Sequence, residues 1–327
     1  MNDAPSATRR AMLASGVLAS LASPALAQAN WPTRAISLVN PFPPGGSTDL
    51  TARAVADLLG RELGQTVIVE NRTGGGTSIA ATAVAQARPD GYTLLVGSPS
   101  LAINPALQPN LTPRDPQREL APIGTTYKSA YVLVVHTELP VRDVAGLIAL
   151  ARARPGALNF GSSGIGTTNH LALELFRSLG QVDVVHVPYR GAAASLLDLR
   201  SGRVQGLFSG GTEVGPLMRE GVIRPLAVTS LTTFPLFPDV PPLAETLPGF
   251  DVTFWQGLFA PAGTPPAVLE RLEAALLRVT RGAELPARLS EQGVQVTPGG
   301  AAELQRLLAA ETEKWGRVIR TAQIRPE

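Results

Sequence analysis

The chain has 327 residues, of which 44% are hydrophobic and 17% charged, so it is long enough for two globular domains and is not a disordered protein. Its 28 lysine and arginine residues nearly balance 26 aspartate and glutamate residues, and the net charge of +2 excludes a protein that binds nucleic acid through a basic surface. Cysteine is absent, which excludes disulfides, thiol catalysis and zinc–thiolate sites.

The first predicted element is an export signal. Arg9 and Arg10 precede an uncharged run of 16 residues, 11–26, that is rich in small apolar side chains. A membrane span needs about 20 residues, and the run closes on Ala-Leu-Ala, the small-x-small pattern after which signal peptidases cut. We therefore expect residues 1–27 to be a signal peptide cleaved near Ala27, by the Sec or the twin-arginine route, and a periplasmic mature protein. An uncleaved anchor helix is the alternative.

Short strands and helices alternate in the chain that follows. Hydrophobic periodicity predicts, in order, a strand at 36–39, a helix at 48–63, a strand at 67–70, a helix at 78–87 and a strand at 93–97. This βαβαβ order is typical of a parallel sheet with helical crossovers. The proline-rich segment 98–118 has no periodicity and predicts a long loop.

A second α/β series follows the predicted loop. Strands are expected at 131–135, 158–160, 184–187, 204–208 and 252–261, and helices at 143–153, 168–179, 192–200, 266–280, 285–292 and 302–321. Two such series predict two α/β lobes with chain crossings near 127–135 and 226–230. The expected division is lobe 1 at 28–128, lobe 2 at 129–228, and a return to lobe 1 with the C-terminal helices at 229–327.

Known catalytic motifs are missing from the sequence. It contains no G-x-S-x-G, no H-E-x-x-H, no P-loop and no dinucleotide-binding fingerprint. The three histidines, His136, His170 and His186, are not spaced as metal ligands on one helix, and their expected role is structural. We expect no enzyme activity, no cofactor and no metal.

Three loops instead share one pattern, in which a strand leads through Gly, Ser and Thr into a helix. They lie at 41–50, 71–80 and 160–171. The first N–H groups of a helix have no intrahelical acceptor and lie at the positive end of its dipole, so such loops bind anions. Capping explains each loop alone, whereas three loops facing one crevice make a donor-lined site.

The residues in these loops favour a carboxylate over a phosphate. They hold no P-loop lysine, and Arg72, which precedes its turn, is their one arginine. Asp49 is unusual for an anion site, and three roles stay open: a helix cap, a water ligand, or an acceptor for a donor on the ligand. Phe42 suits either the wall of the site or the core.

The order of these motifs resembles the Bug (TctC-like) family of extracytoplasmic solute receptors. The matching stretches include "PFPPGGSTDLTAR", "VIVENRTGGGTSIAA", "NFGSSGIGTTNHLALELF", "VHVPYRGAAASLLDL" and "GLFAPAGTPP", and they span essentially the whole mature chain. The resemblance implies a type II periplasmic-binding-protein fold, an α/β architecture whose two lobes are joined by crossing strands and close over a small ligand. It also implies a small organic carboxylate as ligand and the membrane subunits of a tripartite tricarboxylate transporter as partners.

The family's ligand loops map onto positions of this sequence. The implied ligand-binding residues are Phe42, Gly46, Ser47, Thr48 and Asp49 in the first loop, Gly75, Gly76, Thr77 and Ser78 in the second, Ser162, Ser163, Thr167, Thr168 and His170 in the third, and Ser209. Relatives commonly carry acidic residues where Gln205 and Ser209 stand. The residue at position 209 pairs with the ammonium group in relatives that bind amino acids, so Ser209 argues against an amino-acid ligand.

The leading hypothesis is a monomeric solute receptor that closes over a carboxylate. Two alternatives stay open. One is a sensor that presents its ligand to a membrane signalling protein. The other is an exported serine hydrolase that uses Ser162 or Ser163 with His170.

Overall fold

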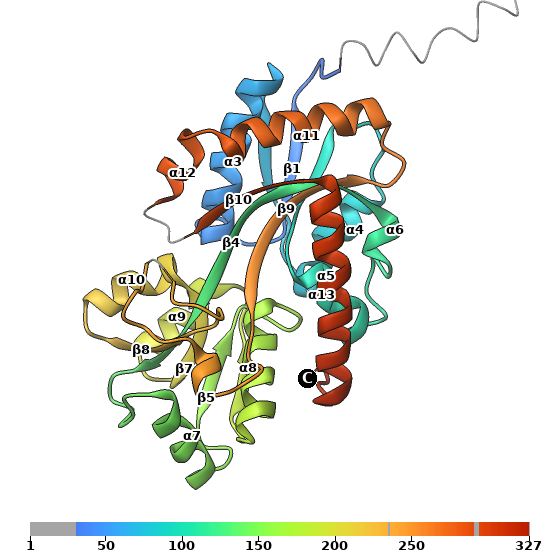
Figure 1. Ribbon diagram of the computed structural model, residues 1–327. Helices are drawn as coiled ribbons and strands as arrows, with labels where there is room; N and C mark the ends of the chain where they lie inside the picture. The colour runs from blue at the N-terminus through green and yellow to red at the C-terminus, as the bar shows by residue number, and fades with distance from the viewer. Residues whose placement is uncertain (1–30, 235, 291–293, 327) are drawn as a thin grey trace, which may run out of the picture.

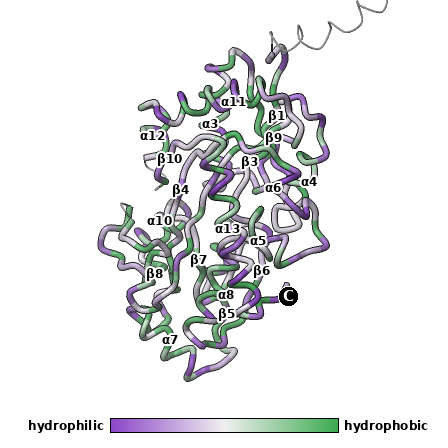
Figure 2. Tube along the Cα trace, turned by 45° about the vertical axis from the view of Figure 1, so that its right-hand side comes forward, coloured by the Kyte–Doolittle hydropathy of each residue, from purple (hydrophilic) through white to green (hydrophobic). Residues whose placement is uncertain are grey.

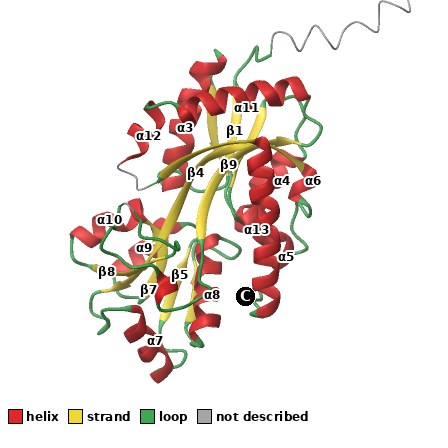
Figure 3. Ribbon diagram, in the orientation of Figure 1, coloured by secondary structure: helices red, strands yellow, loops and turns green. Residues whose placement is uncertain are grey.

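The computed structural model describes residues 31–234, 236–290 and 294–326; the predicted signal peptide lies outside these residues. Two α/β lobes are joined by two long strands, β4 (Leu120–His136) and β9 (Thr253–Pro261), as Figures 1 and 3 show. This is the two-lobed α/β architecture that the sequence predicts.

Lobe 1 is built on the predicted βαβαβ unit. Strand β1 (Ile36–Asn40) pairs in parallel with β2 (Val67–Asn71) and β3 (Thr93–Gly97), while β9 adds antiparallel to β3. Strand β1 is almost entirely buried, as expected for a strand covered on both faces. The remaining elements of this lobe are α3 (Ser47–Leu63), η1 (Gly75–Thr77), α4 (Ser78–Ala85), α11 (Pro266–Arg281), α12 (Glu284–Leu289) and β10 (Gln295–Gly300), which pairs with β4.

Lobe 2 repeats the arrangement around β5 (Asn159–Ser162). This strand pairs in parallel with β6 (Val185–Pro188) and β7 (Gly206–Gly210), and β7 is antiparallel to β4. The other elements are α7 (Val144–Ala153), α8 (Thr168–Gly180), α9 (Ala192–Arg200), α10 (Gly211–Arg219), β8 (Ile223–Val228) and η2 (Leu243–Glu245). Helix α10, which the sequence analysis did not predict, begins directly where β7 ends.

Strand β4 makes the first crossing between the lobes. Its residues 120–130 pair with β9, and its residues 131–135 pair with β7. After β8 the chain stays beside lobe 2, because the N–H of Val252 donates to the carbonyl of Thr229 at 3.0 Å and Phe250 stacks on Phe208 at 6.0 Å between ring centroids. We therefore propose that the return to lobe 1 begins after Val252 rather than at residue 229.

The predicted long loop at 98–118 is wrong, because this segment contains α5 (Ser100–Leu107) and α6 (Pro116–Glu119). Helix α5 includes Pro105, which sequence reasoning takes as a helix breaker. Its apolar residues are buried, and the C-terminal helix α13 (Ala301–Thr321) packs on it. Tertiary packing thus outweighs the poor local propensity.

Helix α13 connects the cores of the two lobes. It starts next to β10 in lobe 1 and runs down one side of the molecule, so that its last turn lies beside lobe 2 (Figure 1). One hydrophobic cluster includes its buried Trp315 together with Leu101 of α5 and Phe176 of α8. Figure 2 shows hydrophobic residues gathered beside β1 in lobe 1 and β8 in lobe 2. Among the described residues, no helix is long and apolar enough to cross a membrane.

Candidate functional site

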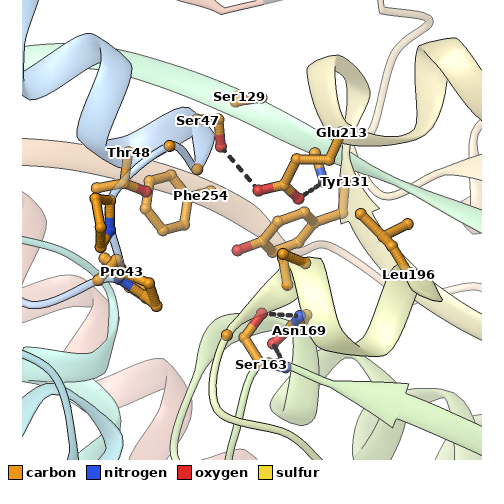
Figure 4. Close-up of a pocket in the computed structure, with 18 of the residues that line it drawn as sticks. Pro43, Ser47, Thr48, Ser129, Tyr131, Ser163, Asn169, Leu196, Glu213 and Phe254 are labelled. Carbon is orange, nitrogen blue, oxygen red and sulfur yellow. Dashed lines mark hydrogen bonds between the residues drawn. The ribbon is translucent and has the colours of Figure 1, made fainter. Parts of the chain in front are cut away.

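A cavity of about 380 Å³ lies between the lobes, and we call it the central chamber. Lobe 1 contributes the first glycine-rich loop, lobe 2 contributes the starts of α8, α9 and α10, and β4 and β9 form the wall between them (Figure 4). Its lining is Phe42, Pro43, Pro44, Gly45, Gly46, Ser47, Thr48, Tyr127, Ser129, Tyr131, Ser163, Asn169, Arg190, Gly191, Ala192, Ala193, Leu196, Gly210, Glu213, Phe254 and Val294.

Asp49 fixes the shape of the first loop from behind. Its buried carboxylate accepts hydrogen bonds from the N–H of Gly45 at 3.0 Å, from Asn71 Nδ2 at 2.7 Å and from Arg53 Nε at 2.9 Å. Burial opposes its ionisation, but these hydrogen bonds outweigh burial and lower the pKa of Asp49. Asp49 does not line the chamber, and the structure places it as a buried anchor of the loop, a role outside the three that the sequence left open.

The anchored loop presents free donors to the chamber. Helix α3 begins after Gly46, and the N–H groups of Gly46, Ser47 and Thr48 find no acceptor among the described residues. These are the donors expected at a helix N-terminus, where the dipole also favours negative charge. The lobe 1 wall of the chamber therefore presents N–H donors that suit an anion.

Lobe 2 supplies a second set of donors. Asn169 Nδ2 donates to Ser163 Oγ at 3.0 Å, which leaves the hydroxyl hydrogen of Ser163 free to point at a ligand (Figure 4). The N–H groups of Ala192 and Ala193, at the start of α9, find no acceptor among the described residues. Arg190 is exposed at the chamber and has no ion-pair partner in the described part of the chain.

An aromatic cluster forms the wall along β4 and β9. Phe254 contacts Phe42, Tyr127 and Tyr131 at centroid distances of 6.4, 5.9 and 6.0 Å. Burial raises the pKa of Tyr127 and of Tyr131 far above the usual tyrosine value, and the negative charge of Glu213 acts in the same direction. Both phenols are therefore protonated over the physiological range, and the wall suits the carbon skeleton of a ligand.

An acidic side chain enters the chamber from lobe 2. Glu213, in the first turn of α10, accepts hydrogen bonds from Ser209 Oγ and from the N–H of Gly210, the latter at 3.3 Å. Its other oxygen accepts from Ser47 Oγ of lobe 1 at 3.3 Å (Figure 4). Ser209 itself does not line the chamber, yet it holds a carboxylate there. The sequence argument from the missing acid at position 209 is therefore incomplete.

The second glycine-rich loop lines a neighbouring cavity of about 560 Å³, which we call the side chamber. Gly75, Gly76 and Thr77 line it together with Thr167, whereas Ser78 is buried beside a small pocket of about 10 Å³. The two lobes are in close contact here. A Cβ on Gly76, whose φ is +57°, would collide with the carbonyl oxygen of Ile165, so the contact requires glycine. Thr77 and Thr167 thus lie between the lobes but outside the central chamber.

Ser162, Thr168 and His170 are buried and line neither chamber. Ser162 Oγ lies 2.7 Å from His186 Nε2, and the rings of His186 and His170 stack at 4.3 Å. Burial lowers the pKa of His170 to about 3 and that of His186 to about 4.

These positions weigh against a serine hydrolase. The Ser162–His186 contact has the chemistry of a nucleophile and base, but Ser162 has no accessible surface and faces no cavity large enough for a substrate. Ser163 does line the chamber, where its hydroxyl is bonded to Asn169 instead of to a histidine. The expectation that the histidines are structural fits this geometry.

Five of the predicted site residues, Phe42, Gly46, Ser47, Thr48 and Ser163, line the central chamber. Sequence reasoning missed its aromatic wall along β4 and β9, together with Asn169, Arg190, the start of α9, and Glu213. One signal was present: "YRGAAAS" and "FSGGTEV" repeat the strand–glycine–helix pattern of the three loops. Within the described residues, no group of three His, Asp or Glu side chains is placed to hold a metal ion.

Comparisons with known proteins agree with this architecture. The family model described as tripartite tricarboxylate transporter family receptor matches residues 51–324. Protein BugT of Bordetella pertussis is 33% identical over 305 residues, which cover 92% of this chain and 93% of BugT.

Two solved structures are similar to this chain over most of its length. R. palustris Rpa4515 with adipate matches at a TM-score of 0.85 and 37% identity, covering 91% of this chain and 100% of that one. MatC (Rpa3494) from Rhodopseudomonas palustris with bound malate matches at a TM-score of 0.83 and 32% identity. The match covers 88% of this chain and 100% of MatC. These similarities confirm the predicted periplasmic-binding-protein fold.

Proposed function

This chain belongs to the tripartite tricarboxylate transporter receptor family, as its resemblance to Bug proteins indicated, and we propose that it captures a small organic carboxylate between its lobes and delivers it to membrane transporter subunits. Rpa4515 and MatC, which share its fold, were solved with the carboxylates adipate and malate. Their ligands support the ligand class but do not identify the ligand of this chain.

The observation that carries the proposal is the set of free donors that faces the central chamber from both lobes. The N–H groups at the start of α3 come from lobe 1, and Ser163 with the N–H groups at the start of α9 comes from lobe 2. A carboxylate oxygen accepts such bonds without needing a clamping arginine pair. The aromatic wall then packs against the carbon skeleton.

The energies are sufficient for a transport receptor. A hydrogen bond to a charged group contributes about 1.5–3 kcal/mol, so four such bonds supply about 6–12 kcal/mol. Micromolar binding needs about 8 kcal/mol net of the entropy lost on association. Four donors and apolar contact thus bring the site into the micromolar range.

Lobe closure follows from the same geometry. A ligand that touches α3 and Ser163 together makes both sets of contacts only when the lobes are close, so it stabilises the closed state relative to an open one. The structure has the lobes in contact, with Ser47 bonded to Glu213 across the cleft. We propose that the closed, ligand-loaded lobes form the surface that transporter subunits recognise, and that the receptor acts as a periplasmic monomer.

The test is a thermal-shift screen of the mature protein, refolded to remove bound ligand, against mono-, di- and tricarboxylates. A ligand with micromolar Kd at millimolar concentration adds about 4 kcal/mol of stability, which is about 6 °C for a protein of this size. Ser163→Ala is expected to weaken binding, since it removes a donor. Ser290→Ala, at an exposed position after α12, is the matched control and is expected to bind normally.

The absence of a shift with every carboxylate, in protein shown to be ligand-free, would contradict the proposed function. Delivery is tested in cells that lack this chain, where uptake of the identified ligand should stop. Uptake should return with the wild-type gene and stay reduced with Ser163→Ala. Normal uptake without the chain would contradict the transport role while leaving ligand binding intact.

A further inference from the structure

The carboxylate of Glu213 is the feature of the central chamber that a simple carboxylate receptor does not explain. A receptor for anions gains nothing from a negative charge inside its site, since like charges raise the cost of binding. Glu213 nevertheless lies on the chamber wall and points toward Ser47 of the other lobe (Figure 4).

Helix capping accounts for only one of its two oxygens. Oε2 accepts from Ser209 Oγ and from the N–H of Gly210, as expected for an acidic residue in the first turn of α10. Oε1 has a single contact, with Ser47 Oγ at 3.3 Å, and that donor belongs to the opposite lobe. One carboxylate oxygen therefore has free acceptor capacity toward the chamber.

Glu213 also lacks a positive partner. No lysine, arginine or histidine of the described residues lies within 4.0 Å of its oxygens, although the side chain is half-buried between the lobes. A partly desolvated carboxylate without a counter-ion is costly unless something else supplies the charge. A cationic group on the ligand would do so.

The aromatic rings of the same chamber favour a cation as well. Phe42, Tyr127, Tyr131 and Phe254 all line it, and both tyrosines feel the charge of Glu213. Aromatic faces attract ammonium groups, and more strongly where water is excluded. An acid beside aromatic rings is a suitable environment for a cationic nitrogen.

A positive side chain and free donors line the same chamber. Arg190, unpaired among the described residues, lies on the wall with the free N–H groups of α9 and the hydroxyl of Ser163. Arg190 and Glu213 form no ion pair with each other in the described chain, so each is available to a ligand. The chamber is thus lined by groups of both signs.

We propose that Glu213 determines specificity, and that the ligand is a monocarboxylate that carries a cationic nitrogen at its other end. The proposal rests on the proposed function, since the carboxylate end uses the lobe 2 donors described above, the Ser163 hydroxyl and the N–H groups at the start of α9. A dicarboxylate of similar length would bring its second carboxylate against Glu213, which disfavours it by repulsion. Glu213 would then separate this receptor from one that takes dicarboxylates.

The experiment is isothermal titration calorimetry on the ligand-free mature protein with butanoate, glutarate, 4-aminobutanoate and 4-(trimethylammonio)butanoate. The wild-type protein is expected to bind at least one of the two zwitterions about tenfold or more tightly than glutarate. Glu213→Gln, which keeps the shape of the side chain, should weaken zwitterion binding about tenfold and strengthen glutarate binding. Glu220→Gln, at the far end of α10 and outside the chamber, is the control and should change neither.

The outcomes separate the two proposals. If glutarate binds the wild-type protein at least as tightly as either zwitterion, the role of Glu213 is overturned while carboxylate capture stands. Unchanged binding of all four compounds in a folded Glu213→Gln protein overturns it too. Since the inference depends on carboxylate binding, absence of binding by any carboxylate overturns both proposals. The order of affinities for glutarate and the two zwitterions in the wild-type protein tests the role of Glu213 even if the variant does not fold.

Discussion

Acidification is expected to destabilise lobe 2 through the stacked pair His170 and His186. Both rings are buried, and burial is the main cause that lowers the pKa of His170 to about 3 and of His186 to about 4, from an ordinary value of 6.5. The nearest carboxylate oxygen to His170, on Glu174, is 4.0 Å from Nε2, beyond hydrogen-bond distance. The positive charge of Arg177 also lowers the pKa of both rings, so the folded state disfavours their protonated forms.

The direction of this pH effect follows from proton binding in the folded and unfolded states. Between the folded and unfolded pKa values the unfolded chain binds more protons, so stability is full above about pH 6.5 and is lost as the pH falls below it. At about pH 5, each histidine then lowers the free energy of unfolding by about 2 kcal/mol, and the pair lowers it by about 4 kcal/mol. For a chain of this size the loss corresponds to about 6 °C in Tm.

The assay is thermal unfolding of the ligand-free protein at about pH 7.5 and about pH 5, compared with His186→Phe. The phenyl ring keeps the stack on His170 but does not titrate, so the variant should lose about half as much stability on acidification as the wild type. His136→Gln removes the histidine outside the pair and serves as the control. Equal losses in wild type and His186→Phe would refute the assignment to the pair.

Three further predictions concern the central chamber. Asp49→Ala should weaken carboxylate binding at least tenfold and lower Tm by several degrees, because the loop loses its anchor. Calorimetry and thermal unfolding measure the two effects, and a variant that binds normally would contradict the anchoring role. Asn169→Ala should weaken binding about tenfold and also lower Tm, since Ser163 loses its orienting donor and Thr167 loses a buried acceptor; an unchanged Kd would remove the amide from the site. Gly191 has a φ of +107°, and Gly191→Ala puts a Cβ 2.8 Å from Cγ of Pro43, so the variant should hold the lobes apart. Small-angle scattering with saturating ligand tests this: a radius of gyration equal to that of the wild type would contradict it.

The sequence was sufficient for features that depend on neighbouring residues. Apolar runs and helical periodicity predicted β1, α3, β2 and β3 to within one or two residues, because each strand or helix buries a face that is written locally. The glycine-rich loops were likewise visible, since a helix N-terminus after a strand leaves the same N–H groups free in any protein. The motif order also identified the family.

The tertiary structure decided which of these local features share a chamber. Gly75 and Gly76 have the same local pattern as Gly46, yet they face the side chamber, because the contact between Pro43 and Gly191 lies between the two cavities. The folding of α5 depends on α13, which lies almost 200 residues further along the chain. Such contacts join distant segments and leave no local periodicity to detect.

The roles of Asp49 and Glu213 could be told apart only in the structure, because they too depend on contacts between distant segments. Asp49 and Glu213 each stand in the first turn of a helix after a glycine loop, and the sequence does not distinguish them. The fold surrounds Asp49 with donors from β2 and α3, which neutralise it as an internal anchor. It leaves one oxygen of Glu213 facing the other lobe, where only the geometry of the closed cleft determines what a ligand must offer.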